Sequence, residues 1–203
     1  MSHIEGILLA AGESRRMGYP KPLLQIGNET FIEHLTRAML AVVPHLTIVI
    51  GAHADRVRPA IPIDARISIV ENRDYLQGQL SSIKAGLRAI ISNLPDAAAA
   101  LIHLTDHPTV KPQTFAAVAE RYRQSGQPIV IARYEGHRGH PVLFDRAMFA
   151  ELLSAPEDQG ARVVVNNNAS RVVYAEVDDA GILLDLDTPE ELHRAGLSLP
   201  AKI

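Results

Sequence analysis

Among its 203 residues the chain has no cysteine and no tryptophan, and aromatic residues make up only 4%. The absence of cysteine excludes disulfide bonds and thiolate metal sites, and it is compatible with the cytoplasmic location that we expect. With so few aromatic rings, a platform for stacking nucleic-acid bases is not evident. A weak apolar run near the N-terminus is interrupted by Glu5 and lacks a basic flank, so we expect no signal peptide.

Long apolar runs and runs of like charge are missing as well. No apolar stretch reaches the roughly 20 residues of a membrane-spanning helix, so no membrane partner is expected. The net charge is −3 and there is no basic run, which argues against a general nucleic-acid binder. Apolar residues are plentiful at 47%, and a chain of this length can bury a sizeable core. We therefore predict a single folded domain over residues 1–203.

Short apolar runs alternate with segments of helical periodicity through most of the chain. The runs at 4–10, 46–50, 67–70 and 97–104 are typical of buried strands. Thr30 and Glu33 form a capping box at the start of the first expected helix, over residues 30–43. This alternation predicts an α/β fold with a mainly parallel, three-layer sheet like a Rossmann fold. Glycines that bracket the polar segment 136–139 predict a late antiparallel excursion.

The first apolar run ends in a turn of small residues, Ala-Ala-Gly at 10–12, where backbone can approach a ligand closely. Arg15, Arg16 and, after a Gly-Tyr-Pro turn, Lys21 follow it. Backbone N–H groups in such a turn form an anion site, and nearby cations would suit a triphosphate. The stretch matches neither of the familiar glycine-rich phosphate loops. Taken alone, an ordinary turn with a solvated arginine pair remains an alternative.

Three aspartates stand out as candidate metal ligands. Asp106 follows the longest apolar strand, at the strand end where open α/β sheets bind ligands, and its oxygen suits Mg²⁺. The alternative for Asp106 is a simple turn cap. Thr188 and Glu191 form a capping box that explains the segment after Asp185 and Asp187, but not these two carboxylates. They lie at alternate positions and would point the same way, which calls for a cation or a proton between them.

Asn72, Gly78 and Ser82 lie in a segment that joins an expected strand to a helix expected from Ser81 to about Ile91. Their donors and acceptors are of the kind that read the edge of a nucleobase. A capped loop explains the same residues, because serine favours helix starts and glycine gives the backbone freedom. From these residues alone the capped loop is the preferred interpretation.

His137, Arg138 and His140 form a polar group in the late excursion. They could grip an anionic acceptor, whereas the plainer alternative is an ordinary surface loop. A metal site at the two histidines lacks a third ligand.

Taken in order, these segments resemble the signature of the MobA-like nucleotidyltransferases. Within that group they are similar to the molybdenum cofactor cytidylyltransferases. The matching motifs are Leu9-Ala10-Ala11-Gly12-x-Ser14-x-Arg16-Met17-Gly18…Lys21-x-Leu23-Leu24, Asn72…Gly78…Ser82, Asp106-x-Pro108, Gly136-x-Arg138-Gly139-His140-Pro141, Asp158-x-Gly160-Ala161-Arg162 and Asp185-x-Asp187-Thr188-Pro189. The chain departs from the family pattern at Glu157, where the family has glycine.

The resemblance implies the sheet of the nucleotide-diphospho-sugar transferases and a transfer of a nucleoside monophosphate from an NTP to a phosphorylated acceptor, with release of pyrophosphate. It implies that Mg²⁺, or Mn²⁺ in its place, is held by Asp106 together with Asp187, while a role for Asp185 stays open. It assigns catalysis to Lys21, Arg16 and Asp106. Nucleotide binding falls to Leu9, Ala10, Ala11, Gly12, Arg16, Lys21, Asn72, Gly78, Ser82 and Asp106, and acceptor binding to Arg138, Gly139, His140 and Arg162.

The resemblance also implies the two substrates. Ala11 favours CTP, because cytidylyl members tend to carry Leu-Ala-Ala-Gly and guanylyl members Leu-Ala-Gly-Gly. The acceptor would then be the pterin phosphate of molybdopterin or of the molybdenum cofactor, and transient contact with a molybdoenzyme or its chaperone stays open. The alternatives are a guanylyltransferase, a sugar- or polyol-phosphate cytidylyltransferase and a delivery protein without catalysis. The Gly-x-Arg-Gly-His-Pro segment speaks against the second, and the intact Lys21 and Asp106 against the last.

Overall fold

A computed structural model describes residues 3–200, and within that range seven strands form one sheet. Their order is β5–β4–β1–β6–β8–β7–β9, and only β8 runs antiparallel to its neighbours. The strands are β1 (His3–Ala10), β4 (Leu46–Ile50), β5 (Ile67–Glu71), β6 (Ala97–Leu104), β7 (Ile129–Tyr134), β8 (His137–Asp145) and β9 (Val172–Glu176). The predicted parallel sheet with one late antiparallel excursion is therefore confirmed.

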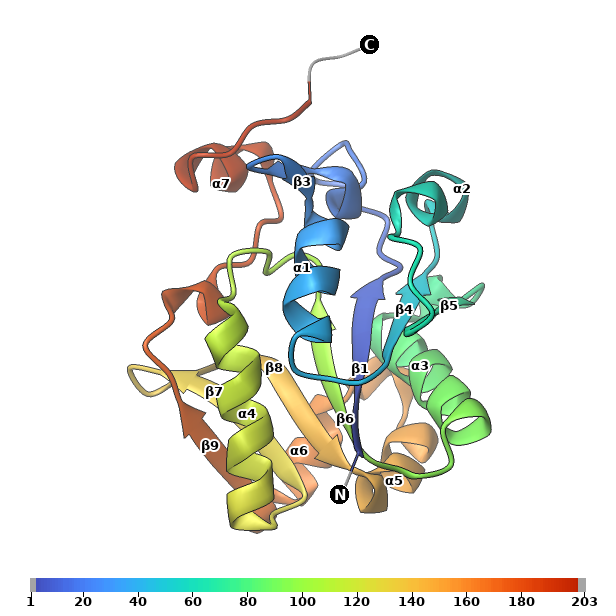
Figure 1. Ribbon diagram of the computed structural model, residues 1–203, viewed down its shortest axis with the longest axis vertical. Helices are drawn as coiled ribbons and strands as arrows, with labels where there is room; N and C mark the ends of the chain where they lie inside the picture. Colours follow the sequence, from blue (N-terminus) through green and yellow to red (C-terminus); the bar gives the residue numbers. More distant parts are fainter. Residues whose placement is uncertain (1–2, 201–203) are drawn as a thin grey trace.

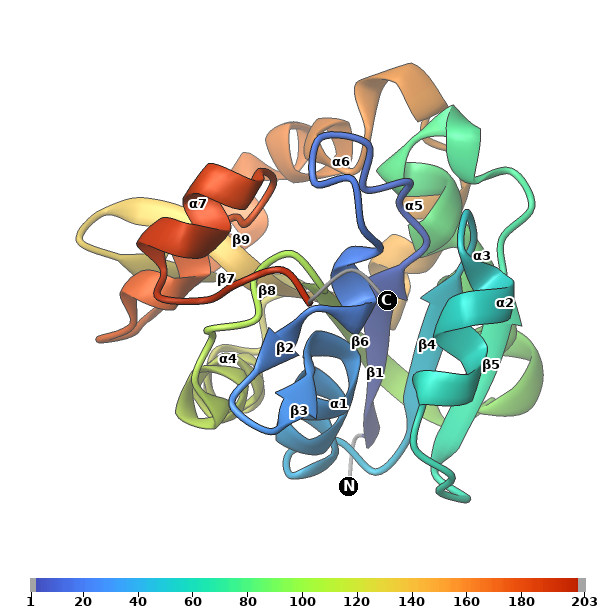
Figure 2. The same ribbon diagram turned by 90° about the horizontal axis from the view of Figure 1, so that it is seen from above.

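Helices cover both faces of the sheet and give the three predicted layers. They are α1 (Phe31–Leu40), α2 (Ala54–Val57), α3 (Gln79–Asn93), α4 (Pro112–Ser125), α5 (Phe149–Ser154), α6 (Arg162–Asn167) and α7 (Pro189–Arg194). Viewed from above, the sheet lies between α1 and α4 on one side and α5 and α6 on the other (Figure 2). No helix formed by residues 3–200 has the length and apolar character needed to cross a membrane.

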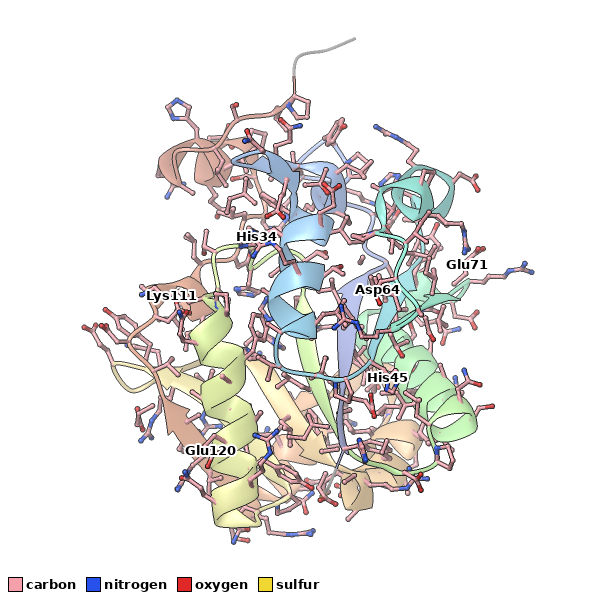
Figure 3. All side chains as sticks on the ribbon, viewed as in Figure 1. His34, His45, Asp64, Glu71, Lys111 and Glu120 are labelled. Carbon is pink, nitrogen blue, oxygen red and sulfur yellow. The ribbon has the colours of Figure 1, made fainter. Side chains whose placement is uncertain are left out.

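The alternation of side chains along β1 builds a separate core on each face of the sheet. Ile4 and Leu8 pack with α1 and α4, whereas Ile7 and Leu9 pack with α3 and α5. Successive residues of a strand point to opposite faces, and both faces are buried here, so the strand is apolar without interruption from residue 6 to residue 10. Charged side chains such as Asp64, Glu71 and Glu120 lie on the outside of the molecule (Figure 3).

A third, small core joins the loop after β1 to the C-terminal part of the chain. It consists of buried residues from both regions, namely Met17, Leu24, Phe31, Leu186 and Leu192. The loop after β1 also carries a two-stranded ribbon, β2 (Gln25–Ile26) and β3 (Glu29–Thr30). This loop lies beside α7 at the carboxyl ends of β1 and β4 (Figure 1). Burial of Leu186 in this core fixes the segment that carries Asp185 and Asp187 above the sheet.

Candidate active site

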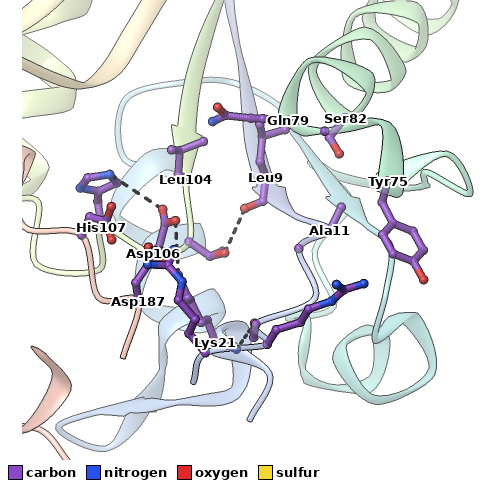
Figure 4. A pocket seen from close by; sticks show the side chains of 17 residues that line it. Leu9, Ala11, Lys21, Tyr75, Gln79, Ser82, Leu104, Asp106, His107 and Asp187 are labelled. Carbon is purple, nitrogen blue, oxygen red and sulfur yellow. Dashed lines mark hydrogen bonds and ion pairs between the residues drawn. The ribbon is translucent and has the colours of Figure 1, made fainter. Parts of the chain in front are cut away.

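A cavity of about 530 Å³ lies at the carboxyl ends of β1 and β6 (Figure 4). Its walls come from four regions of the chain: the loop after β1, the start of α3, the end of β6 and the segment before α7. Ligands of open α/β sheets bind at this end of the strands, because the connecting loops diverge there. The volume is in the range of about 300–1,000 Å³ that is usual for small-molecule sites.

Three carboxylates meet at one side of this cavity. Asp106, Asp185 and Asp187 each place one oxygen so that the three lie within 4.8 Å of one another. The backbone N–H of Leu186 donates to the Asp106 carbonyl at 2.9 Å, which ties the two segments together. The pair predicted from the sequence is thus brought together, and Asp185 joins it. Asp185 and Asp187 were expected to alternate as residues of a strand do, but residues 184–187 belong to no strand.

The donor set fits a divalent cation such as Mg²⁺. Oδ1 of Asp106 is buried and has no hydrogen-bond partner in the described part of the chain. Burial raises the pKa of Asp185, and the negative charges of Asp187 and Asp106 raise it further. Clustered carboxylate oxygens with unused capacity are the ligands that Mg²⁺ and Mn²⁺ prefer.

Two cations face the carboxylates. The Lys21 ammonium bonds to Asp187 and lies 3.5 Å from Oδ2 of Asp106, and the Arg16 guanidinium pairs with Asp187. Burial of Asp187 opposes its ionisation, but the hydrogen bond and charge of Lys21, with the charge of Arg16, outweigh that effect and lower its pKa. The predicted cationic turn and the predicted metal ligands therefore converge on one place.

The loop that carries these cations is fixed by hydrogen bonds from several sides. Ser14 has a positive φ of 53°, and its Oγ accepts from the backbone N–H of Lys21 at 3.0 Å. The turn closes with a bond from the Gly18 N–H to the Ser14 carbonyl at 3.0 Å. On the other side, His53 Nε2 lies 2.9 Å from the carbonyl oxygen of Glu13, where only a ring N–H can donate. Lys21 is therefore held in place by its backbone rather than by its side chain alone.

Most residues predicted to bind nucleotide line this cavity, but Ala10 and Asn72 do not. The lining includes Leu9, Ala11, Gly12, Arg16, Lys21, Gly78, Ser82 and Asp106. Ala10 is buried in the core on the α1 side. The Asn72 amide donates to Ser81 Oγ at 2.8 Å and Ser82 Oγ at 3.0 Å, and its oxygen accepts from the Asp74 N–H. Asn72 thus orients Ser82 from behind the wall.

A second cavity, of about 780 Å³, contains all four residues predicted to bind the acceptor. Arg138, Gly139 and His140 come from β8, and Arg162 begins α6. The remaining walls are largely apolar and include Ile102, Ile131, Val142 and Phe144. Gln79, His107 and Asp185 line both cavities, so the two spaces meet beside the carboxylates.

The histidines of β8 do not supply positive charge to this second cavity. Desolvation of the His140 ring, and then the charge of nearby His107, lower its pKa to about 4, although Asp106 acts in the opposite direction. His140 is therefore neutral at pH 7 and can offer a hydrogen bond only. His137 is exposed and does not line the cavity. Arg138 and Arg162 are the charged members of the predicted set.

Several lining residues were not predicted from the sequence. Tyr75 and Gln79 lie within the segment 72–82 that was singled out, and Thr105 and His107 flank Asp106 (Figure 4). Their proximity to predicted residues was the available signal, but sequence does not tell which neighbours point into a cavity.

Comparison with known proteins agrees with this geometry. A family model described as MobA-like NTP transferase domain matches residues 6–172. The chain is 28% identical to the molybdenum cofactor cytidylyltransferase of Escherichia coli (strain K12), over 94% of each protein. It is also 28% identical to the molybdenum cofactor guanylyltransferase of Rhizobium meliloti (strain 1021), over 96% of this chain and 91% of that one.

Solved structures are similar to this chain over most of its length. Rv0371c from Mycobacterium tuberculosis H37Rv superposes with a TM-score of 0.80 and 30% identity, covering 95% of this chain and 96% of that one. Its complex with manganese superposes with a TM-score of 0.75 and 28% identity, covering 95% and 97%. The relatives include both cytidylyl- and guanylyltransferases, so their names do not decide the nucleotide.

Proposed function

The chain belongs to the family of MobA-like NTP transferase domains, and from that premise we propose that it transfers CMP from CTP to the phosphate of molybdopterin or of the molybdenum cofactor. Pyrophosphate is the second product. The observation that carries the proposal is the junction of two cavities beside three carboxylates, with cations facing them. Two substrates held in adjoining cavities can react without leaving the protein, which replaces a bimolecular encounter by positioning.

The proposed reaction is an in-line substitution at the α-phosphorus of CTP. An oxygen of the acceptor phosphate forms the new O–P bond, and the bond from the α-phosphorus to the bridging oxygen breaks, so that pyrophosphate leaves with the electron pair. A phosphate monoester is already anionic, so no strong general base is required. Lys21 and Arg16 bind the triphosphate and offset its charge as pyrophosphate leaves.

Asp106 and Asp187 would hold the divalent ion, with Asp185 as a further ligand. When bound, Mg²⁺ or Mn²⁺ supplies positive charge to phosphate oxygens. Lys21 pairs with Asp106 and Asp187, and Arg16 pairs with Asp187. A divalent ion at the carboxylates would leave Lys21 and Arg16 available to pair with the phosphates of an anionic nucleotide.

The second cavity supports a flat, phosphorylated acceptor. Arg138 and Arg162 offer guanidinium groups, which bind phosphate through paired N–H donors. Apolar walls from Ile102, Val142 and Phe144 suit the face of a ring system. The neutral His140 can hydrogen-bond a heterocycle without repelling it.

Ala11 supports CTP as the nucleotide. It lines the first cavity and is almost fully buried there. Its methyl group adds volume to the cavity wall that a glycine would lack, which leaves less room for a larger base.

The experiment is a pyrophosphate-release assay with Mg²⁺ in which CTP, GTP, ATP and UTP are each combined with molybdopterin, the molybdenum cofactor or a sugar phosphate. We expect release with CTP and a pterin phosphate. Release with GTP instead would reassign the nucleotide, and release with a sugar phosphate would reassign the acceptor. Nucleotide binding without release for any pair would favour a delivery protein.

A further inference from the structure

A buried lysine links the helix beside the first cavity, here called the nucleotide cavity, to the loop beside the second cavity, here called the acceptor cavity. Lys84 lies on α3, and its side chain is only 9% exposed. Its ammonium donates to the Ala155 carbonyl at 2.7 Å and to Oε1 of Glu157 at 2.7 Å. Neither Lys84 nor Glu157 lines either of these two cavities, and the proposed reaction uses neither.

The loop that Lys84 holds supplies one wall of the acceptor cavity. Gln159, Gly160, Ala161 and Arg162 all line that cavity and follow Glu157 after one intervening residue. The loop has little internal structure: its short 3₁₀ turn, Glu157–Gln159, is closed by long backbone bonds of 3.2 Å and 3.3 Å. Its position therefore depends on contacts with the rest of the protein.

The other end of this connection is fixed by the nucleotide site. α3 begins at Gln79, and both Gln79 and Ser82 line the nucleotide cavity less than two helical turns from Lys84. A helix is rigid over this length, so the loop that Lys84 binds is held at a fixed distance from the residues of α3 that line the nucleotide cavity. An ammonium inside a protein needs compensation, and here one carboxylate and one carbonyl supply it.

We propose that the Lys84–Glu157 ion pair is a positioning device that sets the acceptor loop, and with it Arg162, at the correct distance from the nucleotide. The inference rests on the proposed function, because it assigns the second cavity to the acceptor. It predicts that loss of the pair impairs use of the acceptor and leaves nucleotide binding intact.

The test compares Lys84→Met and Glu157→Ala with two controls. Glu157→Gln keeps an oxygen that accepts from the ammonium, and Arg88→Met removes an exposed cation one turn further along α3. For the first two variants we expect kcat/KM for the acceptor to fall roughly 10²-fold, the loss that a misplacement of about 1 Å causes. Titration calorimetry should give an unchanged Kd for CTP with Mg²⁺. Arg88→Met should resemble the wild type, and Glu157→Gln, which keeps the accepting oxygen but loses the charge of the carboxylate, should fall between the wild type and Glu157→Ala.

The pair acts as one unit, so the double variant Lys84→Met with Glu157→Ala should be no worse than the poorer single variant. If Lys84→Met does not fold, Glu157, whose side chain is 28% exposed, carries the test alone. Equal losses for acceptor and CTP, additive losses in the double variant, or acceptor kinetics that match Arg88→Met would each overturn the proposal.

Hydrogen exchange of the free protein separates this inference from the proposed function. Loss of the pair should speed exchange of the Gln159 and Gly160 amides and leave the amides of residues 81–84 unchanged. If exchange is faster but the protein transfers CMP to no pterin, the ion pair does position the loop, and the assignment of the second cavity to a pterin acceptor is wrong. If exchange is unchanged, the ion pair does not position the loop, whatever transfer activity the variants retain.

Discussion

Substitution of Asp179 should both destabilise the protein and disturb its carboxylate cluster. The Asp179 side chain is 2% exposed and accepts three hydrogen bonds, from the Lys111 N–H at 2.9 Å, the Thr114 hydroxyl at 2.6 Å and the Gly181 N–H at 3.0 Å. The first two donors begin α4, whereas Gly181 opens the segment that leads to Asp185. Asp179 therefore anchors that segment to a helix.

The magnitude follows from the number of bonds. A hydrogen bond to a charged group contributes about 1.5 kcal/mol or more, so Asp179→Ala should lower the free energy of unfolding by about 4–5 kcal/mol. For a chain of this size that corresponds to a fall in Tm of roughly 10–15 °C. Asp179→Asn retains one accepting oxygen and should fall between the wild type and Asp179→Ala.

Urea unfolding and thermal melting measure the loss, with Asp178→Ala, at an exposed neighbouring position, as the matched control. At a temperature where Asp179→Asn is folded, its affinity for Mn²⁺ should also be weaker than that of the control, because Asp185 and Asp187 lose their anchor. A loss of stability for Asp179→Ala no larger than that for Asp178→Ala would show that Asp179 does not anchor this segment.

Three further outcomes follow from the site. Lys21→Ala should lower kcat by about 10²–10³, the usual cost of removing one preorganised donor, and unchanged turnover in the pyrophosphate assay would remove Lys21 from catalysis. Ala11→Gly should raise kcat/KM for GTP relative to CTP, and an unchanged ratio would show that residue 11 does not select the base. Stability should fall as pH decreases from 6.5 to 4, because the unfolded chain protonates its histidines first, while folded His140 has a pKa of about 4. At pH 4 this amounts to about 3 kcal/mol, and urea unfolding of His140→Gln should show a flatter pH profile than the wild type.

Local signals in the sequence predicted the fold well. Thr30 with Glu33 and Thr188 with Glu191 form the two capping boxes that the sequence indicated. β6 has the bounds that its apolar run predicted. By contrast, α3 begins two residues before its expected start, at Gln79, because Gly78 adopts a positive φ of 104° and stops the preceding turn.

A residue of the candidate site was predictable only where its position in the chain implies the direction in which its side chain points. Asp106 lies in the turn that directly follows a central strand, so it had to face the ligand edge of the sheet. The direction of Asn72 depends on hydrogen bonds to Ser81 and Ser82 that no pattern specifies. Lys84 and Glu157 are 73 positions apart, and only the packed structure reveals that they meet. The neutrality of His140 depends on desolvation, which requires coordinates.

The most direct test of the account follows the phosphorus atoms of CTP. Wild-type protein is incubated with Mg²⁺, a molybdopterin acceptor and CTP labelled at either the α- or the γ-phosphate. We expect the α-label in a pterin–CMP conjugate and the γ-label in pyrophosphate, and we expect Asp106→Asn to abolish both. Release of the α-label as free CMP, or its retention in CTP while the acceptor is bound, would contradict transfer between the two cavities.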